Sequence, residues 1–263
     1  MKKKLYRFFI ELTNRPLISK WLERFTRSPY SRFMIPSFTR VYQLNLDEME
    51  KSITEYQSLH DLFTRKLKNK SRTIEIGDQV VTSPVDGVLE DFGEISDDHT
   101  FIAKGKSYSI SEMLGDNEKK RKYINGTFLI LYLSPSHYHR IHAPISGDIV
   151  AQWSLGTSSY PVNNWGVKYG KSPFTKNYRV ISEIVSNGAY LALVKVGAMF
   201  VNGIEVTHKG ESIKKGEEIG YFAFGSTVIL LFEKASFSPN ALSKKMDVQI
   251  GQVLGTIRTG KTD

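Results

Sequence analysis

The chain has 263 residues, of which 40% are hydrophobic and 24% charged, a globular composition that excludes disorder over most of its length. It has no cysteine, which excludes disulfides, thiolate nucleophiles and cysteine metal sites. The net charge of +9 is unevenly distributed, because residues 1–40 hold ten Lys or Arg and only two acidic residues. Such a cationic segment suits an anionic membrane or a nucleic acid.

Apolar residues recur at helical spacing in residues 3–13 and again in residues 17–27. This pattern predicts two amphipathic helices with basic polar faces, separated at Arg15-Pro16. Aromatic residues opposite cations are typical of helices at a membrane interface, although these faces could instead pack on the protein core. There is no run of 18 apolar residues, so we expect no membrane span, and no secretory signal because Glu11 interrupts the first apolar run.

Further along the chain, helical spacing gives way to short apolar runs. A third helix is predicted to begin near Asp47, because apolar residues recur at helical spacing from Met49 to Leu67. After residue 72, short apolar runs alternate with turn residues. These runs are residues 80–81, 87–89, 128–133, 191–196 and 228–232. The predicted fold class is α+β, with N-terminal amphipathic helices followed by a mostly antiparallel β body.

Three of the six histidines, His137, His139 and His142, directly follow the apolar run 128–133. Imidazole is the natural proton shuttle near neutral pH and the commonest zinc ligand in proteins. Zinc peptidases on small β scaffolds often add a His-x-x-x-Asp motif, but no histidine here has an aspartate four residues later. A zinc hydrolase is therefore disfavoured and no metal is expected, while hydrogen-bonded loop histidines remain the plain alternative.

The segment Gly225-Ser226-Thr227 leads into the apolar run 228–232. Its plain interpretation is a β-turn whose hydroxyl groups bond to the backbone. Its chemical interpretation is self-cleavage, because a glycine has no side chain to block attack on its carbonyl and tolerates strained dihedral angles. A histidine would deprotonate the serine and an aspartate would orient the histidine. Asp86, in a Pro-x-Asp-Gly turn, is one of several available acids, and the pattern does not select it.

Several segments, in order along the chain, resemble the phosphatidylserine decarboxylases. They are residues 56–67 (YQSLHDLFTRKL), 83–89 (SPVDGVL), 101–114 (FIAKGKSYSISEML), 126–145 (GTFLILYLSPSHYHRIHAPI) and 215–232 (KGEEIGYFAFGSTVILLF). The resemblance covers roughly residues 45–250, and the histidine segment followed by the Gly-Ser-Thr segment is its most specific part.

The resemblance implies that Asp86, His142 and Ser226 form a self-cleavage triad. Ser226 would attack the Gly225 carbonyl and convert the amide into an ester. Elimination would leave a dehydroalanine, which would tautomerise and lose ammonia to give an N-terminal pyruvoyl group, the expected cofactor. The products, residues 1–225 and 226–263, would remain together as a heterodimer that is open to further assembly.

The resemblance also implies the reaction. The pyruvoyl group would form a Schiff base with the amine of phosphatidylserine and take up electrons as CO₂ leaves, the role usually played by pyridoxal. His139 would protonate the resulting carbanion, and hydrolysis would release phosphatidylethanolamine. Arg179 ends a run, Asn177-Tyr178-Arg179, that is similar to an Asn-Glu-Arg run of the family, and it could meet a phosphate.

These expectations divide the chain into a basic amphipathic membrane-associating arm, residues 1–45, and a catalytic domain, residues 46–263. We expect a peripheral protein on the cytoplasmic side of the cell membrane. The alternative is a non-enzymatic membrane-binding β module in which Ser226 never reacts and the chain stays at full length. Nucleic acid is not an expected partner, because the basic residues gather in the arm and not on the β body.

Overall fold

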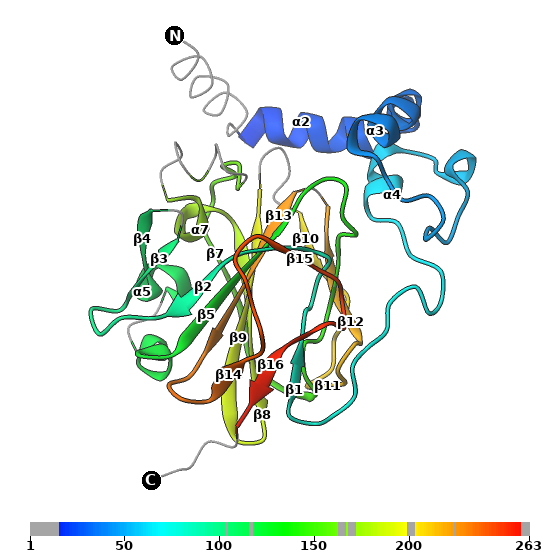
Figure 1. Ribbon diagram of the computed structural model, residues 1–263. Helices are drawn as coiled ribbons and strands as arrows, with labels where there is room; N and C mark the ends of the chain where they lie inside the picture. The colour runs from blue at the N-terminus through cyan, green and yellow to red at the C-terminus, as the bar shows by residue number, and fades with distance from the viewer. Residues whose placement is uncertain are drawn as a thin grey trace.

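The computed structural model describes residues 16–103, 105–115, 118–162, 167, 172–198, 203–223 and 225–258. A helical segment lies across one end of a β body, which confirms the predicted α+β class (Figure 1). Helix α2 (Pro16–Arg27) confirms the helix expected over residues 17–27, and it begins at a proline, whose fixed φ suits a first helical turn. The helix expected over residues 3–13 falls outside the described residues.

The helical segment continues with short elements. They are η1 (Pro29–Met34), α3 (Ile35–Tyr42), η2 (Ile53–Glu55) and α4 (Leu59–Phe63). The prediction of one helix from Asp47 to Leu67 is wrong, because Ser52 and Ser58 have extended backbone and each starts a new helical turn as its N-cap. The apolar residues of this stretch instead pack into one cluster with α3. Sequence reasoning did not predict helix α3. The buried members of the cluster are Ile35, Phe38, Leu44, Met49, Tyr56, Leu59, Leu62 and Phe63.

The β body is built on an eight-stranded antiparallel sheet in the order β11-β7-β8-β9-β13-β5-β2-β15. In chain order its strands are β2 (Gly87–Glu94), β5 (Thr127–Leu133), β7 (Gly147–Leu155), β8 (Arg179–Ser186), β9 (Ala189–Gly197), β11 (Ser212–Ile213), β13 (Ser226–Phe232) and β15 (Met246–Val248). Four of the five predicted apolar runs lie in its strands β2, β5, β9 and β13, and the run 80–81 lies in β1.

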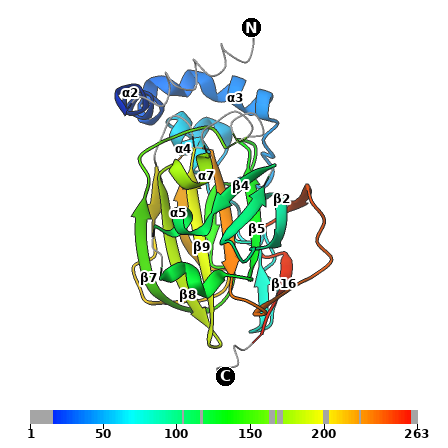
Figure 2. The ribbon, with the colours of Figure 1, turned by 90° about the vertical axis from the view of Figure 1, so that its left-hand side faces the viewer.

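Smaller elements cover both faces of this sheet (Figures 1 and 2). One face packs against two three-stranded sheets, β1 (Val80–Thr82) with β16 (Val253–Ile257) and β14 (Phe237–Pro239), and β10 (Ile204–Val206) with β12 (Glu218–Phe222) and β6 (Arg140–His142). The other face packs against β3 (Thr100–Ala103), β4 (Lys106–Ser109), α5 (Ile110–Leu114), η3 (Lys119–Tyr123) and α7 (Pro173–Lys176).

Strand β13 is buried on both sides, and its side chains alternate between the two core clusters. Val228 and Leu230 belong to the core on the side of the small sheets, whereas Ile229 and Leu231 belong to the core on the helical side. By the same alternation, Ser226 points into the core between the large sheet and the small sheets.

A lysine is buried in that same core. Lys195, on β9, lies opposite Val228 and is 1% exposed. Its Nζ donates to Ser182 Oγ at 2.7 Å, and Ser182 donates to Gln152 Oε1 at 2.9 Å. Within the described part of the chain no carboxylate pairs with this amine, so burial lowers the pKa of Lys195 from 10.5 to about 7.

Replacing Lys195 with methionine should stabilise the protein at neutral pH. The unfolded chain keeps the lysine proton up to about pH 10.5, whereas the folded chain loses it near pH 7, so the stability of the wild type rises with pH across this window. Lys195→Met should therefore raise the free energy of unfolding by about 2–4 kcal/mol at pH 7, and by progressively less toward pH 10.

The measurement is urea unfolding at both pH values, with the exposed Lys234→Met as a matched control that should leave stability unchanged. An equal effect of Lys195→Met at pH 7 and pH 10 would show that the amine is not the cause.

Candidate active site

Ser226 is the first residue of β13, where this strand pairs with the last residues of β5 and β9, Leu133 and Gly197. Its side chain is fully buried, and Oγ has no hydrogen-bond partner among the described residues. Among the described residues, a Cβ atom at Gly225 would meet the Ala198 Cβ alone, at an ordinary 3.7 Å. Packing against these residues therefore does not require a glycine at position 225.

His139 lies between β5 and β6 and is also fully buried. Its Nδ1 is 2.9 Å from the carbonyl oxygen of His137, which makes Nδ1 the protonated nitrogen and leaves Nε2 as a free acceptor. Burial, and then the positive charge of Arg65, lower the pKa of His139 well below its usual range. The imidazole is therefore neutral near pH 7 and can take up a proton at Nε2.

His142, at the end of β6, lies on one of two linked proline turns. Its backbone N–H donates to the Pro84 carbonyl at 2.8 Å, while the Thr82 N–H donates to the Pro144 carbonyl at 2.9 Å. These reciprocal bonds hold Asp86 and His142 on adjoining turns. The imidazole Nδ1 of His142 is 2.7 Å from the Gly216 carbonyl oxygen, and its Nε2 is buried without a partner.

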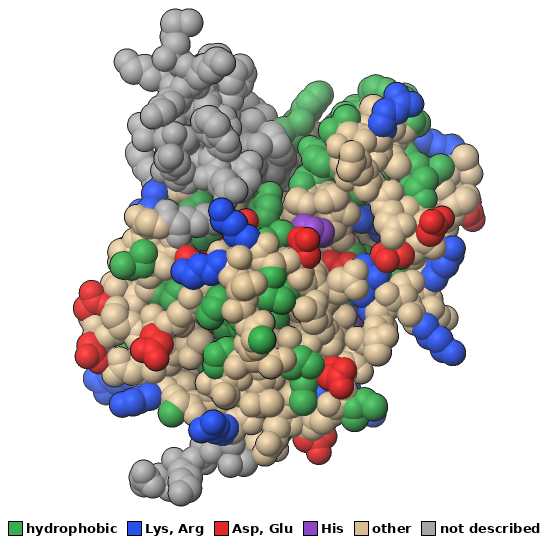
Figure 3. All heavy atoms as spheres, in the orientation of Figure 1, with side chains coloured by type: hydrophobic (Ala, Val, Ile, Leu, Met, Phe, Trp, Pro, Cys, Tyr) green, Lys and Arg blue, Asp and Glu red, His purple; other side chains and the backbone are tan. Residues whose placement is uncertain are grey.

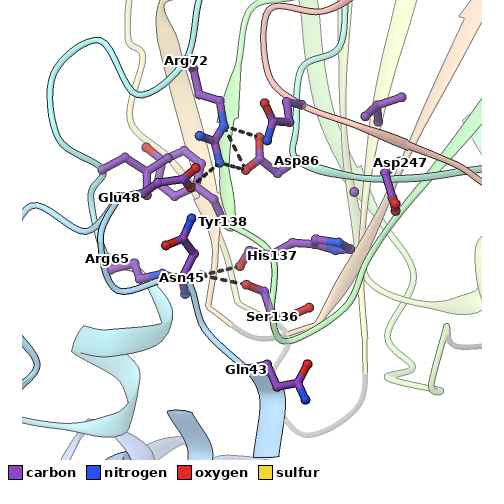
Figure 4. A pocket seen from close by; sticks show the side chains of 14 residues that line it. Gln43, Asn45, Glu48, Arg65, Arg72, Asp86, Ser136, His137, Tyr138 and Asp247 are labelled. Atoms are coloured by element: carbon purple, nitrogen blue, oxygen red, sulfur yellow. Dashed lines mark hydrogen bonds and ion pairs between the residues drawn. The ribbon is translucent and has the colours of Figure 1, made fainter. Parts of the chain in front are cut away.

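Asp86 is bound to other partners than His142 (Figure 4). The Nε of Arg72 donates to both carboxylate oxygens of Asp86, at 3.0 and 3.1 Å, and the backbone N–H of Ile250 donates to Oδ1 at 2.9 Å. Arg72 also pairs with Glu48 at 2.9 Å. No hydrogen bond joins Asp86 to His142 in the described part of the chain. The structure thus places these two residues on neighbouring turns without linking them.

Three of the predicted site residues carry a buried polar atom that has no hydrogen-bond partner among the described residues. Eight buried side-chain polar atoms of the described residues have no hydrogen-bond partner, and three of them are His139 Nε2, His142 Nε2 and Ser226 Oγ. Buried polar atoms are almost always paired, so each exception needs an explanation. An ordinary β-turn serine would bond to its own backbone, which Ser226 does not. The arrangement has the character of a reactive site.

A cavity of about 380 Å³ lies between the helical segment and the β body (Figure 4). Its lining includes Arg65, Arg72, Asp86, His137 and Asp247, but not Ser226. Sequence reasoning missed both arginines as site residues, and Arg65 had only the resemblance of residues 56–67 to mark it. Among the described residues no group of three His, Cys, Asp or Glu is placed to hold a metal ion.

Arg179 is placed differently from its expected role. It is buried on β8, where its guanidinium donates to the carbonyls of Glu112, Met113 and Asn177. Three of its five N–H donors are thus used by backbone carbonyls in the protein interior.

Comparison with known proteins finds one family model and several relatives that match most of this chain. The family model described as phosphatidylserine decarboxylase matches residues 59–256. The chain is 56% identical over 262 residues to a protein of Anoxybacillus flavithermus, covering 99% of both chains. It is 54% identical over 256 residues to one of Geobacillus kaustophilus, covering 97% of both, and 50% identical over 257 residues to one of Bacillus cereus, covering 97% of this chain and 98% of the relative. All three are named phosphatidylserine decarboxylase proenzyme.

Removing the partner of Asp86 should destabilise the precursor. Arg72→Met leaves a largely buried carboxylate with only the Ile250 N–H, and should cost about 3–5 kcal/mol of unfolding free energy. Glu48→Gln, which keeps the contact between Arg72 and Asp86, should cost less than about 1 kcal/mol. The measurement is urea unfolding on a Ser226→Ala background, so that processing does not interfere. Equal losses for the two variants would refute the assignment of the effect to Asp86.

Proposed function

The chain belongs to the phosphatidylserine decarboxylase family, and from this membership we propose that it cuts itself between Gly225 and Ser226 and decarboxylates phosphatidylserine with a pyruvoyl group made from Ser226. The products are phosphatidylethanolamine and CO₂. The observation that supports this most is the buried hydroxyl of Ser226, which has no hydrogen-bond partner among the described residues. His139 and His142 each carry a buried Nε2 atom that is likewise without a partner among the described residues.

In the self-cleavage step the Ser226 Oγ attacks the Gly225 carbonyl carbon, and the peptide bond between Gly225 and Ser226 becomes an ester. His142 Nε2 takes the hydroxyl proton and returns it to the departing amide nitrogen of Ser226, which becomes an amine. Asp86 can orient His142 in this step only after its contact with Arg72 changes, because that contact occupies both carboxylate oxygens.

Position 226 fits the group that would be formed there. The side chain at position 226 is closed to solvent and lies on the side of the core that faces the small sheets. Its oxygen makes no hydrogen bond with the described residues. A pyruvoyl carbonyl supplies the electron sink that decarboxylation of an α-amino acid needs. His139 serves as the proton carrier at Nε2, because its Nδ1 is already bound to the His137 carbonyl. Its Nε2 would take up a proton that the substrate ammonium gives up and return it to the carbon that loses CO₂.

The two products are proposed to stay together as a heterodimer. Residues 226–263 contribute β13, which pairs along its whole length with β5 and β9 of residues 1–225. Cleavage breaks one peptide bond and none of these strand pairings.

Peripheral attachment to the cytoplasmic side of the cell membrane is part of the proposal. Large apolar side chains of the helical segment are exposed, namely Trp21, Tyr30, Phe33, Val41 and Leu46. Figure 3 shows hydrophobic side chains gathered on this end of the molecule, with Lys and Arg around them. That combination suits an anionic lipid surface. Within the described residues, no helix has the length and apolar character to cross a bilayer.

Intact mass under denaturing conditions tests the cleavage. The wild type should yield a 38-residue fragment, residues 226–263, lighter by one ammonia than the plain peptide. Ser226→Ala and His142→Ala should remain whole. Ser236→Ala is the matched control, because this buried serine bonds to the Glu233 carbonyl and should not affect cleavage.

His139→Ala should cut itself but release CO₂ from dispersed phosphatidylserine about 10²–10⁴-fold more slowly. A wild-type chain that stays whole in the presence of anionic lipid would overturn the proposal in favour of a binding module.

Membrane attachment is tested by Trp21→Ser, Phe33→Ser and Val41→Ser combined, because deleting the helical segment would also uncover the buried cluster around Phe38 and Phe63. Each substitution should remove about 1–2 kcal/mol of the free energy gained when an apolar side chain is buried in the membrane. Binding to phosphatidylserine-containing vesicles should therefore weaken at least about tenfold. Cosedimentation at two salt concentrations measures it. The exposed Val150→Ser on the β body is the control, and equal binding by both proteins would remove this surface from the proposal.

A further inference from the structure

Three consecutive residues, Phe63 at the end of helix α4 and then Thr64 and Arg65, contact the loop that carries His139. These residues come from the helical segment, some 75 positions earlier in the chain. The chemistry proposed above assigns none of them a role.

The first contact is a ring contact. The ring centroid of Phe63 lies 4.0 Å from that of His139, with the planes tilted by 42°. Both side chains are fully buried. Phe63 is held in turn by Phe38 of α3, at 6.3 Å between ring centroids. A fully buried ring at this distance restricts rotation of the imidazole and excludes water from one of its faces.

The second contact acts on the hydrogen bond of the imidazole. Arg65 Nη2 donates to the carbonyl oxygens of Ser136 and His137, at 2.9 and 3.0 Å. The His137 carbonyl is the same group that accepts the Nδ1 proton of His139, at 2.9 Å. Its two lone pairs are thus shared between a guanidinium and the imidazole. Arg65 is 5% exposed, so its charge acts in a poorly solvated environment.

The third contact fixes the other side of the loop. The carbonyl oxygen of Thr64 accepts from Nε and Nη2 of Arg140, at 3.1 and 2.9 Å. Arg140 also pairs with Glu218 of β12 through Nη1, at 2.7 and 2.9 Å. The backbone is therefore anchored on both sides of His139, at residues 136–137 and at residue 140.

His142 is held differently. Its bonds go to Gly216 and Pro84, and none joins it to residues 63–65 in the described part of the chain. Residues 63–65 therefore contact the surroundings of His139 and not those of His142.

We propose that Phe63 and Arg65 are positioning residues for His139, which hold its imidazole in the Nδ1-protonated tautomer and leave Nε2 available for proton transfer during decarboxylation. The inference rests on the proposed function and deepens it. It requires that loss of either side chain impairs turnover and spares self-cleavage, because the latter depends on His142.

The test uses the full chain with Arg65→Met, Arg65→Lys and Phe63→Leu. Arg32→Met is the matched control, since Arg32 lies in the same helical segment and donates to the Thr54 carbonyl, away from the histidine loop. Intact mass measures self-cleavage, and CO₂ release from dispersed phosphatidylserine gives kcat and KM. Misplacement by about 1 Å can cost about 10²-fold in rate, so we expect Arg65→Met and Phe63→Leu to lower kcat about 10- to 100-fold with KM nearly unchanged. Arg65→Lys should recover part of the loss.

Two further readouts separate positioning from loss of structure. Besides burial, the groups that lower the pKa of His139 are Arg65 and His137, so removing the Arg65 charge should move the His139 limb of the kcat pH profile to higher pH. In the uncleaved Ser226→Ala protein, NMR of labelled histidines should show the Nδ1-protonated tautomer of His139, and Arg65→Met should disturb it.

The outcomes are distinct. A wild type that neither cuts itself nor releases CO₂ overturns the proposed function. An active wild type with Arg65→Met and Phe63→Leu equal to it, in rate and in pH profile, overturns the positioning role alone. If these variants fail to cut themselves while Arg32→Met succeeds, the contacts of Phe63 and Arg65 are needed for the fold or for self-cleavage. This outcome also contradicts the inference.

Discussion

The pairing of β13 with β5 and β9 is the constraint on which the rest of the site depends. All seven residues from Ser226 to Phe232 pair with both neighbouring strands, so the depth and direction of Ser226 are set by a ladder and not by a flexible turn. A one-residue slip would turn the Ser226 side chain to the opposite face of the sheet. The burial of seven consecutive residues opposes such a slip, because each apolar side chain already occupies its own core.

Around this strand the polar groups are arranged as in a precursor. Asp86 is bound by Arg72 and the Ile250 N–H, and His142 by the Gly216 carbonyl, so each side chain has a partner other than the one that self-cleavage requires. The Nε2 atoms of His139 and His142 and the Ser226 hydroxyl are among the buried polar atoms of the described residues that have no hydrogen-bond partner. The energy needed to connect Asp86 with His142 is the energy of exchanging one set of buried hydrogen bonds for another, which is much less than that of leaving a charge unpaired.

The sequence predicts strands better than helices here, for physical reasons. Runs such as 128–133 and 228–232 are buried on both faces, so composition alone reveals them. The stretch 47–67 shows helical spacing because its apolar residues share one cluster, yet Ser52 and Ser58 cap separate turns. Sequence reasoning does not predict helix α3, which has Pro36 in its first turn, a position to which proline is well suited.

The candidate site is likewise predictable from the sequence only in part. Its histidines and serine lie in recognisable segments, and their proposed roles rest on a resemblance. The contacts of Arg72 with Asp86 and of Phe63 with His139 join residues 14 and 76 positions apart, and neither follows any local pattern. The contacts of Arg179 were not predictable for a related reason, since a sequence does not reveal that backbone carbonyls will accept from a guanidinium.

The strands that follow the proposed cleavage site are spread over two sheets. β13 is interior and β15 is an edge strand of the large sheet, while β14 and β16 belong to a small sheet that also contains β1. A fragment with this distribution cannot leave as a unit without opening both layers at once. If the proposed cut is made, we expect the cut protein to behave kinetically as a single molecule: dilution should not dissociate it, and the small fragment should not exchange between copies, so a chain that loses activity should not be renewed by a fresh fragment.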